Sequence, residues 1–217
     1  MNDDFHLLWG LPILKTKINP DSYNKKEIID VVEKNYLKQP IRQNWSNSFF
    51  NTDIHHSNSD EKNKNFEKPN YNLLYKAYVD PLKFYLKQIN LNKNKKVRID
   101  IVNYTASRNA SFMEPHIHSE CDFSMIHYIQ FDKKENNPTV FLNPYSFNDF
   151  WINQGKLISN TDESNPSNSW VFSEWRYDVE EDDIIIFPAI LRHFVRNKKT
   201  LKTRIVVASN IFLTQVV

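Results

Sequence analysis

The sequence predicts a mainly β protein with N-terminal helices and a double-stranded β-helix, or jelly-roll, core. Between residue 20 and about residue 96, apolar residues recur mainly with a helical period, and after it with a period of two. Because the helices precede the strands instead of alternating with them, a doubly wound βαβ sheet is not expected. The 217 residues suit a single domain over 1–217. We expect a helical N-terminal flank over 1–96 and the jelly roll over 97–217.

The N-terminal flank contains four predicted segments. Residues 8–18 alternate as a strand does, and residues 20–37 carry an apolar stripe typical of a helix. Residues 38–69 are largely polar and predict a long surface loop. A second helix is expected over 70–89, with a break or kink at Pro81, because proline lacks the N–H that the helix interior needs.

The second half of the chain reads as eight short strands separated by turn-rich connections. Short strands with polar turns are typical of double-sheeted jelly rolls. The expected strands are 97–104, 112–118, 123–131, 139–142, 170–177, 183–187, 193–196 and 204–212. Since the chain has only two glycines, Gly-rich phosphate-binding loops are excluded.

Composition narrows the classes of partner. The formal net charge of +2 argues against duplex DNA as a partner and gives no reason to expect binding to anionic lipid. One cysteine, Cys121, excludes an internal disulfide framework and fits a reducing compartment. The chain shows neither a signal-peptide pattern at its start nor an apolar run of about 18 residues. We therefore expect a soluble cytoplasmic protein; its high aromatic content is compatible with a homodimer.

The most informative motif is Pro115-His116-Ile117-His118, followed much later by His193. In an extended strand, side chains at i and i+2 point to the same side, so His116 and His118 can share one target. Imidazole is the commonest protein ligand for transition metals. A third histidine from a distant strand, with open positions left over, predicts a catalytic metal site more than a closed structural one.

Four segments together carry a resemblance to a known family. The chain has Pro115-His116-Ile117-His118, followed by a strand that reads Phe-Ser-Met-Ile-His-Tyr over 123–128. Later it has Phe187-Pro188, followed by His193, and then Arg204-Ile205, followed by Asn210. These segments resemble the Fe(II)/2-oxoglutarate-dependent oxygenases, and most closely a branch common in bacterial and phage genomes.

The resemblance implies an iron enzyme, a hydroxylase, whose catalytic core is residues 97–217. Fe(II) and the co-substrate 2-oxoglutarate would be its cofactors, and O₂ and a small-molecule or peptide substrate its partners. In the resembled family, an arginine placed like Arg204 holds the distal carboxylate of 2-oxoglutarate, which a guanidinium can bind in a two-pronged fork. Tyr128 stands where related oxygenases often have a tyrosine that hydrogen-bonds the same carboxylate.

The carboxylate ligand of the metal is left open by the sequence. The usual family triad is His-x-Asp/Glu and a distant histidine, but the residue two after His116 is His118. Glu120 fits the spacing one step later, and Asp122, just before the Phe-Ser strand, is favoured by the resemblance. We predict His116, His118, Asp122 and His193 as metal ligands, with Glu120 or coordination by three histidines as alternatives.

Two other functions fit the same residues. The spacing of His116, His118 and Asp122 is also similar to a metal motif of cupins, which share the jelly roll and need no 2-oxoglutarate. The missing cupin glycines and the absence of a role for Arg204 in that pattern favour the oxygenase. The non-enzymatic alternative is a jelly-roll binding module whose histidines are structural.

Overall fold

The computed structural model describes residues 4–8, 10–38, 43–45, 50–52, 54–57, 66–91, 95–145, 162, 164–165, 168 and 171–215. Its helices are η1 (Pro20–Ser22), α1 (Lys25–Lys38), α2 (Asn72–Ala77) and α3 (Val79–Gln88). Its strands are β1 (Asp4–Leu8), β2 (Leu11–Lys17), β3 (Gln43–Trp45), β4 (Phe50–Thr52), β5 (Ile54–Ser57), β6 (Lys95–His116), β7 (Phe123–Gln130), β8 (Thr139–Leu142), β9 (Glu174–Arg176), β10 (Asp183–Pro188) and β11 (His193–Gln215).

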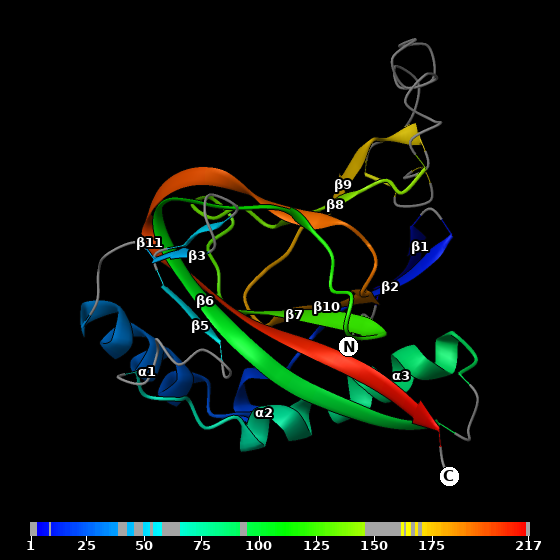
Figure 1. Ribbon diagram of the computed structural model, residues 1–217, viewed down its shortest axis with the longest axis horizontal. Coiled ribbons are helices and arrows are strands. Elements are labelled where there is room, and N and C mark those ends of the chain that lie inside the picture. Colours follow the sequence, from blue (N-terminus) through cyan, green and yellow to red (C-terminus); the bar gives the residue numbers. More distant parts are fainter. Residues whose placement is uncertain are drawn as a thin grey trace.

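All described strand pairs are antiparallel, and two long strands connect two layers (Figure 1). The major sheet has the order β1-β2-β10-β7-β11-β6. In the second layer, the beginning of β11 pairs with β8, which pairs with β9, and the end of β6 pairs with β4. β6 and β11 stay paired along their whole length, from His193↔His116 to Gln215↔Lys95. The pair curves from one layer into the other, which gives the jelly roll predicted from the sequence.

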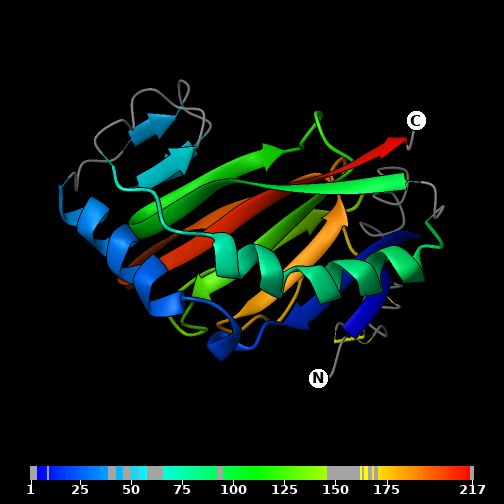
Figure 2. The same cartoon turned by 90° about the horizontal axis from the view of Figure 1, so that it is seen from below.

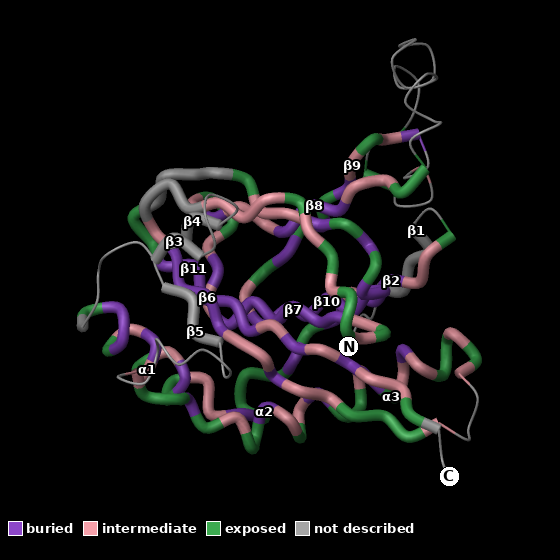
Figure 3. Tube along the Cα trace, viewed as in Figure 1, coloured by how far each residue is buried: buried purple, intermediate pink, exposed green. Residues whose placement is uncertain are grey.

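The major sheet is covered by apolar side chains on both faces, as alternation along β10 demonstrates. Ile184 and Ile186 pack in one apolar cluster with residues of the helices. Ile185 and Phe187 point the other way, into a second cluster between the sheet layers. A strand buried on both faces reads as a continuous apolar run, which is what residues 184–187 are. Figure 3 shows β7 and β10 as the buried centre of the molecule.

The helices cover the outer face of the major sheet and leave the other face to the second layer (Figure 2). Their buried side chains include Leu74 of α2, Leu82 and Tyr85 of α3, and Tyr78 at the junction of the two helices. The predicted break near Pro81 is observed as the boundary between these helices at Tyr78, since the proline occupies the first turn of α3, where a missing N–H is tolerated.

Two of the differences from the sequence prediction concern polar stretches. The predicted polar loop over 38–69 contains the short strands β3, β4 and β5, of which β4 and β5 pair with β6. The predicted gaps at 105–111 and 197–203 are absent, because these polar stretches pair with each other across β6 and β11, with several register shifts. Polar residues therefore do not end these strands, because partner strands satisfy their backbone groups.

The described helices are all too short or too polar to cross a membrane.

Candidate metal centre and cofactor cavity

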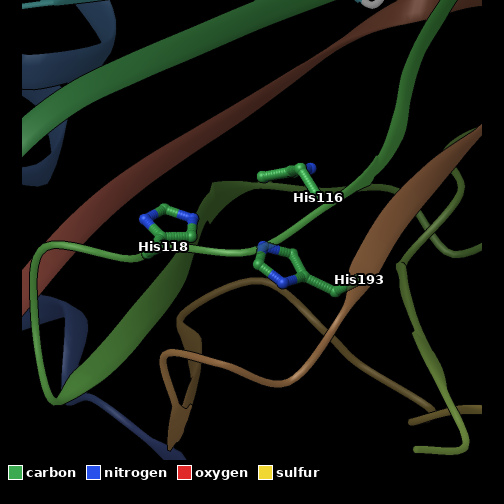
Figure 4. Close-up of side chains that lie close together, drawn as sticks. All are labelled: His116, His118 and His193. Atoms are coloured by element: carbon green, nitrogen blue, oxygen red, sulfur yellow. The ribbon is translucent and has the colours of Figure 1, made fainter.

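Three histidines meet where β6 ends and β11 begins (Figure 4). His116 is the last residue of β6 and pairs directly with His193, the first residue of β11. His118 follows two residues after the strand. One potential ligand atom from each of the three side chains lies within 4.8 Å of the other two. Within the described part of the chain, this is the group of histidine, cysteine and acidic side chains that is arranged to hold a metal ion.

One nitrogen of each imidazole is held by an oxygen acceptor. The Nδ1 atoms lie 2.8 Å from the carbonyl of Glu114 for His116, and 2.9 Å from the carbonyl of Leu191 for His193. Nδ1 of His118 lies 3.2 Å from Oδ1 of Asn210. Because these oxygens only accept hydrogen bonds, each Nδ1 carries the hydrogen, and Nε2 is the nitrogen whose lone pair could coordinate a metal.

Burial keeps the three imidazoles neutral. It lowers the pKa of His118 to about 4, with a smaller contribution from the neighbouring His116. Burial also lowers the pKa of His116 and holds that of His193 well below its usual range. The neutral imidazole is the form that coordinates a metal, so at neutral pH the three side chains have the protonation state that metal binding would require.

Backbone hydrogen bonds fix the segment that carries His118. The N–H of His118 donates to the carbonyl of Ala189 at 2.9 Å, and the N–H of Ala189 donates to the carbonyl of Asp122 at 3.1 Å. The N–H of Asp122 donates to the carbonyl of Ile211 at 3.0 Å. The segment is therefore attached to the end of β10 and to β11, which sets the position of His118 relative to His193.

The histidines border a cavity of about 570 Å³ between the two sheet layers. One wall comes from β11, where Arg204, Val206, Ala208 and Asn210 follow each other at every second position. The lining is mixed, with apolar side chains beside the histidines and uncharged polar groups. The remaining described lining residues are Val102, Asn103, Thr105, Met113, Ile117, Ser119, Glu120, Ser124, Met125, Ile126, Thr139, Phe187 and Val195.

Arg204 places a buried cation in this cavity. Its side chain is 7% exposed, and its Nε donates to the carbonyl of Asn137 at 3.0 Å. Among the described residues no carboxylate lies within salt-bridge distance of it. Burial lowers the pKa of Arg204, but a guanidinium stays charged in proteins. A buried charge without a partner is costly, so an anionic ligand would be stabilised here.

The aromatic ring of Tyr128 packs against the guanidinium of Arg204. The guanidinium carbon is 5.5 Å from the centre of the Tyr128 ring, within the range of a cation–π contact. The hydroxyl of Tyr128 accepts a hydrogen bond from the N–H of Thr139 at 3.0 Å. The fully buried tyrosine thus connects the arginine to β8 of the second layer.

The two candidate carboxylates are not part of the histidine cluster. Oδ2 of Asp122 accepts a hydrogen bond from the N–H of Leu213 at 2.7 Å, so this side chain is used to hold the end of β11. Glu120 is exposed and lines the cavity beside the exposed Ile117 and Ser119. Among the described residues, the potential metal-ligand atoms that lie close together are the imidazole nitrogens of His116, His118 and His193.

Asn210 is a residue of the site to which the sequence analysis gave no role. It appeared only as the last position of the Arg204 motif, although its amide contacts a predicted metal ligand. A signal was present, because residues separated by an even number of positions share one face of a strand. Asn210 is six residues after Arg204, and both line the cavity.

Comparison with known proteins connects this part of the chain to a family. A model of the family described as "Putative 2OG-Fe(II) oxygenase" matches residues 103–210, the segment that contains the histidines, Arg204 and Asn210. A comparison with curated proteins finds no match.

Solved structures with the same fold include three prolyl hydroxylases. A prolyl-4-hydroxylase of Pseudomonas putida is 7% identical, covers 92% of this chain and 91% of its own, and has a TM-score of 0.50. A Trichoplax adhaerens prolyl hydroxylase, solved with a peptide fragment of hypoxia inducible factor, is 10% identical over 92% and 83% of the chains, with a TM-score of 0.52. The viral collagen prolyl hydroxylase of Paramecium Bursaria Chlorella virus-1, solved with 2OG, is 10% identical over 92% and 94%, with a TM-score of 0.50.

At this level of identity the structures confirm the jelly-roll fold, and the family model supplies the activity and its cofactors, Fe(II) and 2-oxoglutarate. The chain belongs to the family of 2OG-Fe(II) oxygenases.

Proposed function

We propose that the protein is a hydroxylase in which His116, His118 and His193 hold Fe(II) and Arg204 binds the distal carboxylate of 2-oxoglutarate. One observation carries this proposal. Three imidazoles with their Nδ1 atoms hydrogen-bonded to oxygens face the same cavity as a buried arginine that has no carboxylate partner among the described residues.

The donor set fits the metal of the family. Neutral imidazole suits Fe(II), and three protein ligands leave positions free for a co-substrate and O₂. Bound together, iron and 2-oxoglutarate supply the O₂-dependent oxidation of the substrate. The three-histidine alternative, which the sequence left open, is the one we adopt, because Asp122 already accepts a hydrogen bond from Leu213.

The chain's own residues hold the reactants. The permanently charged guanidinium of Arg204 can bind a carboxylate through two parallel hydrogen bonds, and the ring of Tyr128 packs against the guanidinium. We assign Tyr128 this supporting role, while its own O–H can still donate to the carboxylate. Apolar side chains such as Met113, Phe187 and Val206 line the cavity. Apolar side chains lower the local dielectric and so strengthen the attraction between the arginine and its anion.

We propose that the substrate is a small molecule or a peptide. Support for a peptide comes from the Trichoplax neighbour, which was solved with a bound peptide fragment. We propose further that the protein works in the cytoplasm, that residues 1–217 act as one domain with the core at 97–217, and that nucleic acid is not its partner. A homodimer remains a prediction that size measurements in solution can test.

An anaerobic titration tests the assignment of Arg204. Adding 2-oxoglutarate to the Fe(II)-loaded protein should produce a visible metal-to-ligand charge-transfer band. In Arg204→Met the affinity for 2-oxoglutarate should fall about 100-fold or more, because two charge-assisted hydrogen bonds are lost. Arg98→Met is the matched control, since Arg98 is exposed and pairs with Asp100 outside the cavity; its affinity should equal the wild type's.

Two results would contradict the proposal. A charge-transfer band with unchanged affinity in Arg204→Met would show that another group holds the distal carboxylate. Bound iron without any band would mean that the site does not chelate 2-oxoglutarate.

A further inference from the structure

The three histidines differ in what holds their Nδ1 atoms. His116 and His193 each bond to the backbone carbonyl of the residue two positions earlier, Glu114 and Leu191. Those acceptors belong to the same stretch of chain as the histidine and cannot be removed by changing a side chain. His118 instead bonds to a side chain 92 residues away, the amide of Asn210.

Asn210 is held firmly enough to serve as such an acceptor. It lies in β11 and pairs with Ser124 of β7 on one side and Asp100 of β6 on the other. The same strand supplies His193 and Arg204. Its position is therefore fixed by two strand neighbours, and its side chain lines the cavity beside His118.

We propose that Asn210 is a positioning residue that sets the tautomer and ring orientation of His118 for metal binding. This inference rests on the proposed role of His118 as a metal ligand. An amide can meet an imidazole nitrogen in two ways. With Oδ1 toward His118, Nδ1 carries the hydrogen and Nε2 is left for the metal. With the amide nitrogen toward His118, Nδ1 would be the acceptor and the hydrogen would sit on Nε2, which blocks coordination.

The observed arrangement is the productive one, with Oδ1 at 3.2 Å from Nδ1. Partners of this kind orient metal ligands, and losing one typically costs about 10- to 100-fold in metal affinity. Because the other two histidines bond to backbone acceptors among the described residues, Asn210 is a point at which a side-chain substitution can weaken the orientation of this cluster without touching a ligand.

Two variants separate the oxygen acceptor from the rest of the side chain. Asn210→Leu keeps the approximate size and removes both polar atoms. Asn210→Asp keeps an oxygen at the same position and removes the amide donor. We expect Asn210→Leu to bind Co(II) about 10- to 100-fold more weakly than the wild type in competition with a chelator. Asn210→Asp should stay within about threefold of the wild type, because a carboxylate accepts the same hydrogen bond.

A matched control removes a buried amide elsewhere. Asn35 in α1 bonds to the hydroxyl of Tyr104 and to the backbone of Glu67 on the helical side of the sheet. Asn35→Leu should lower the stability of the protein and leave its Co(II) affinity unchanged. This control separates an effect on the histidine from a general loss of stability.

The tautomer gives a second measurement that does not depend on affinity. In the Zn(II)-loaded wild type, nitrogen-15 NMR of the imidazoles should show the hydrogen of His118 on Nδ1, and Asn210→Asp should keep it there. Equal Co(II) affinities for the wild type and Asn210→Leu would overturn the inference. So would a loss in Asn210→Asp as large as in Asn210→Leu, because the donor would then be the group that matters. A wild type that binds neither Co(II) nor Zn(II) would instead overturn the proposed metal site itself.

Discussion

Two buried histidines lie on opposite sides of the major sheet and have different surroundings. His193 borders the cavity between the sheet layers, with the rings of His116 and His118 centred 4.3 and 5.3 Å away. His127 of β7 points toward the helices, where it meets the edges or faces of Tyr23 and Tyr78 at 5.3 and 5.6 Å. Burial lowers the pKa of both imidazoles. A perturbed pKa alone therefore does not distinguish a candidate ligand from a packing residue.

What distinguishes the two histidines is the number of donors that converge on one point. Nδ1 of His127 lies 2.9 Å from the hydroxyl of Tyr78, and its Nε2 is buried without a hydrogen-bond partner in the described structure. Nearby, Tyr23 donates to Asp182, which also pairs with Lys25. These contacts attach the helical flank to the sheet. The cavity side, in contrast, collects three imidazoles and an arginine around open space.

The largest predicted difference between the two sides is in metal affinity. His193→Ala should weaken Co(II) binding by more than about 100-fold, because removing a ligand costs more than removing a ligand's hydrogen-bond partner. His127→Asn should bind Co(II) as the wild type does, although it changes a residue of equal burial. Competition with a chelator, monitored by Co(II) absorption, measures both.

Either of two results would break this comparison. If His193→Ala kept its Co(II) affinity, the cluster would not be the metal site. If His127→Asn lost affinity as strongly as His193→Ala, the helical side would be coupled to the metal in a way that the observed contacts do not explain.

The sequence predicted which side chains gather around the cavity better than it predicted the contacts that they make. The i, i+2 spacing placed His116 and His118 together, and the distant His193 and Arg204 were found because their spacing matched a family motif. The role of Asp122 could not be predicted, because its contact with the N–H of Leu213 depends on how the chain folds back across 91 residues. The contact between Asn210 and His118 depends on the same long-range folding, although the even spacing from Arg204 already indicated that Asn210 shares the cavity face.

The fold was predictable where the period of apolar residues is regular, and less so where strands are polar. The helices and the strands β7, β8 and β10 occur close to where the sequence placed them. Residues 105–111 looked like a turn because they are small and polar, yet they continue β6. Their strand character comes from pairing with β11, a long-range property that a local pattern does not record.

A smaller difference is expected in the pH dependence of stability. Burial, with a smaller contribution from the charge of Lys25, lowers the pKa of His127 to about 3, whereas an unfolded histidine titrates near 6.5. Between these values the unfolded chain binds a proton that the folded protein does not, so acid destabilises the fold. His127→Asn removes this group and keeps an amide that can bond to the hydroxyl of Tyr78.

Denaturant unfolding of metal-free protein at several pH values between 4.5 and 6.5 measures this effect. The free energy of unfolding of the wild type should fall more steeply with decreasing pH than that of His127→Asn, by up to about 1.4 kcal/mol per pH unit. The cavity histidines also titrate, but they are the same in both proteins and cancel in the difference. Parallel curves would mean that His127 is protonated in the folded protein and that its contact with Tyr78 is not that of a neutral imidazole.

The smallest predicted effect is the loss of stability in Asp122→Ala. The metal affinity of the same variant tests whether three histidines alone, or histidines with a carboxylate, bind the metal. Asp122→Ala removes the acceptor for the N–H of Leu213 at the exposed end of β11, which should cost about 0.5–1.5 kcal/mol of stability. Its Co(II) affinity should stay at the wild-type level, as should that of Glu120→Ala. A tenfold or greater loss of affinity in one of the two would identify that carboxylate as a ligand. The chain segment 118–122 would then have to rearrange when the metal binds, because Asp122 is held by Ile211 and Ala189 through its backbone and by Leu213 through its side chain.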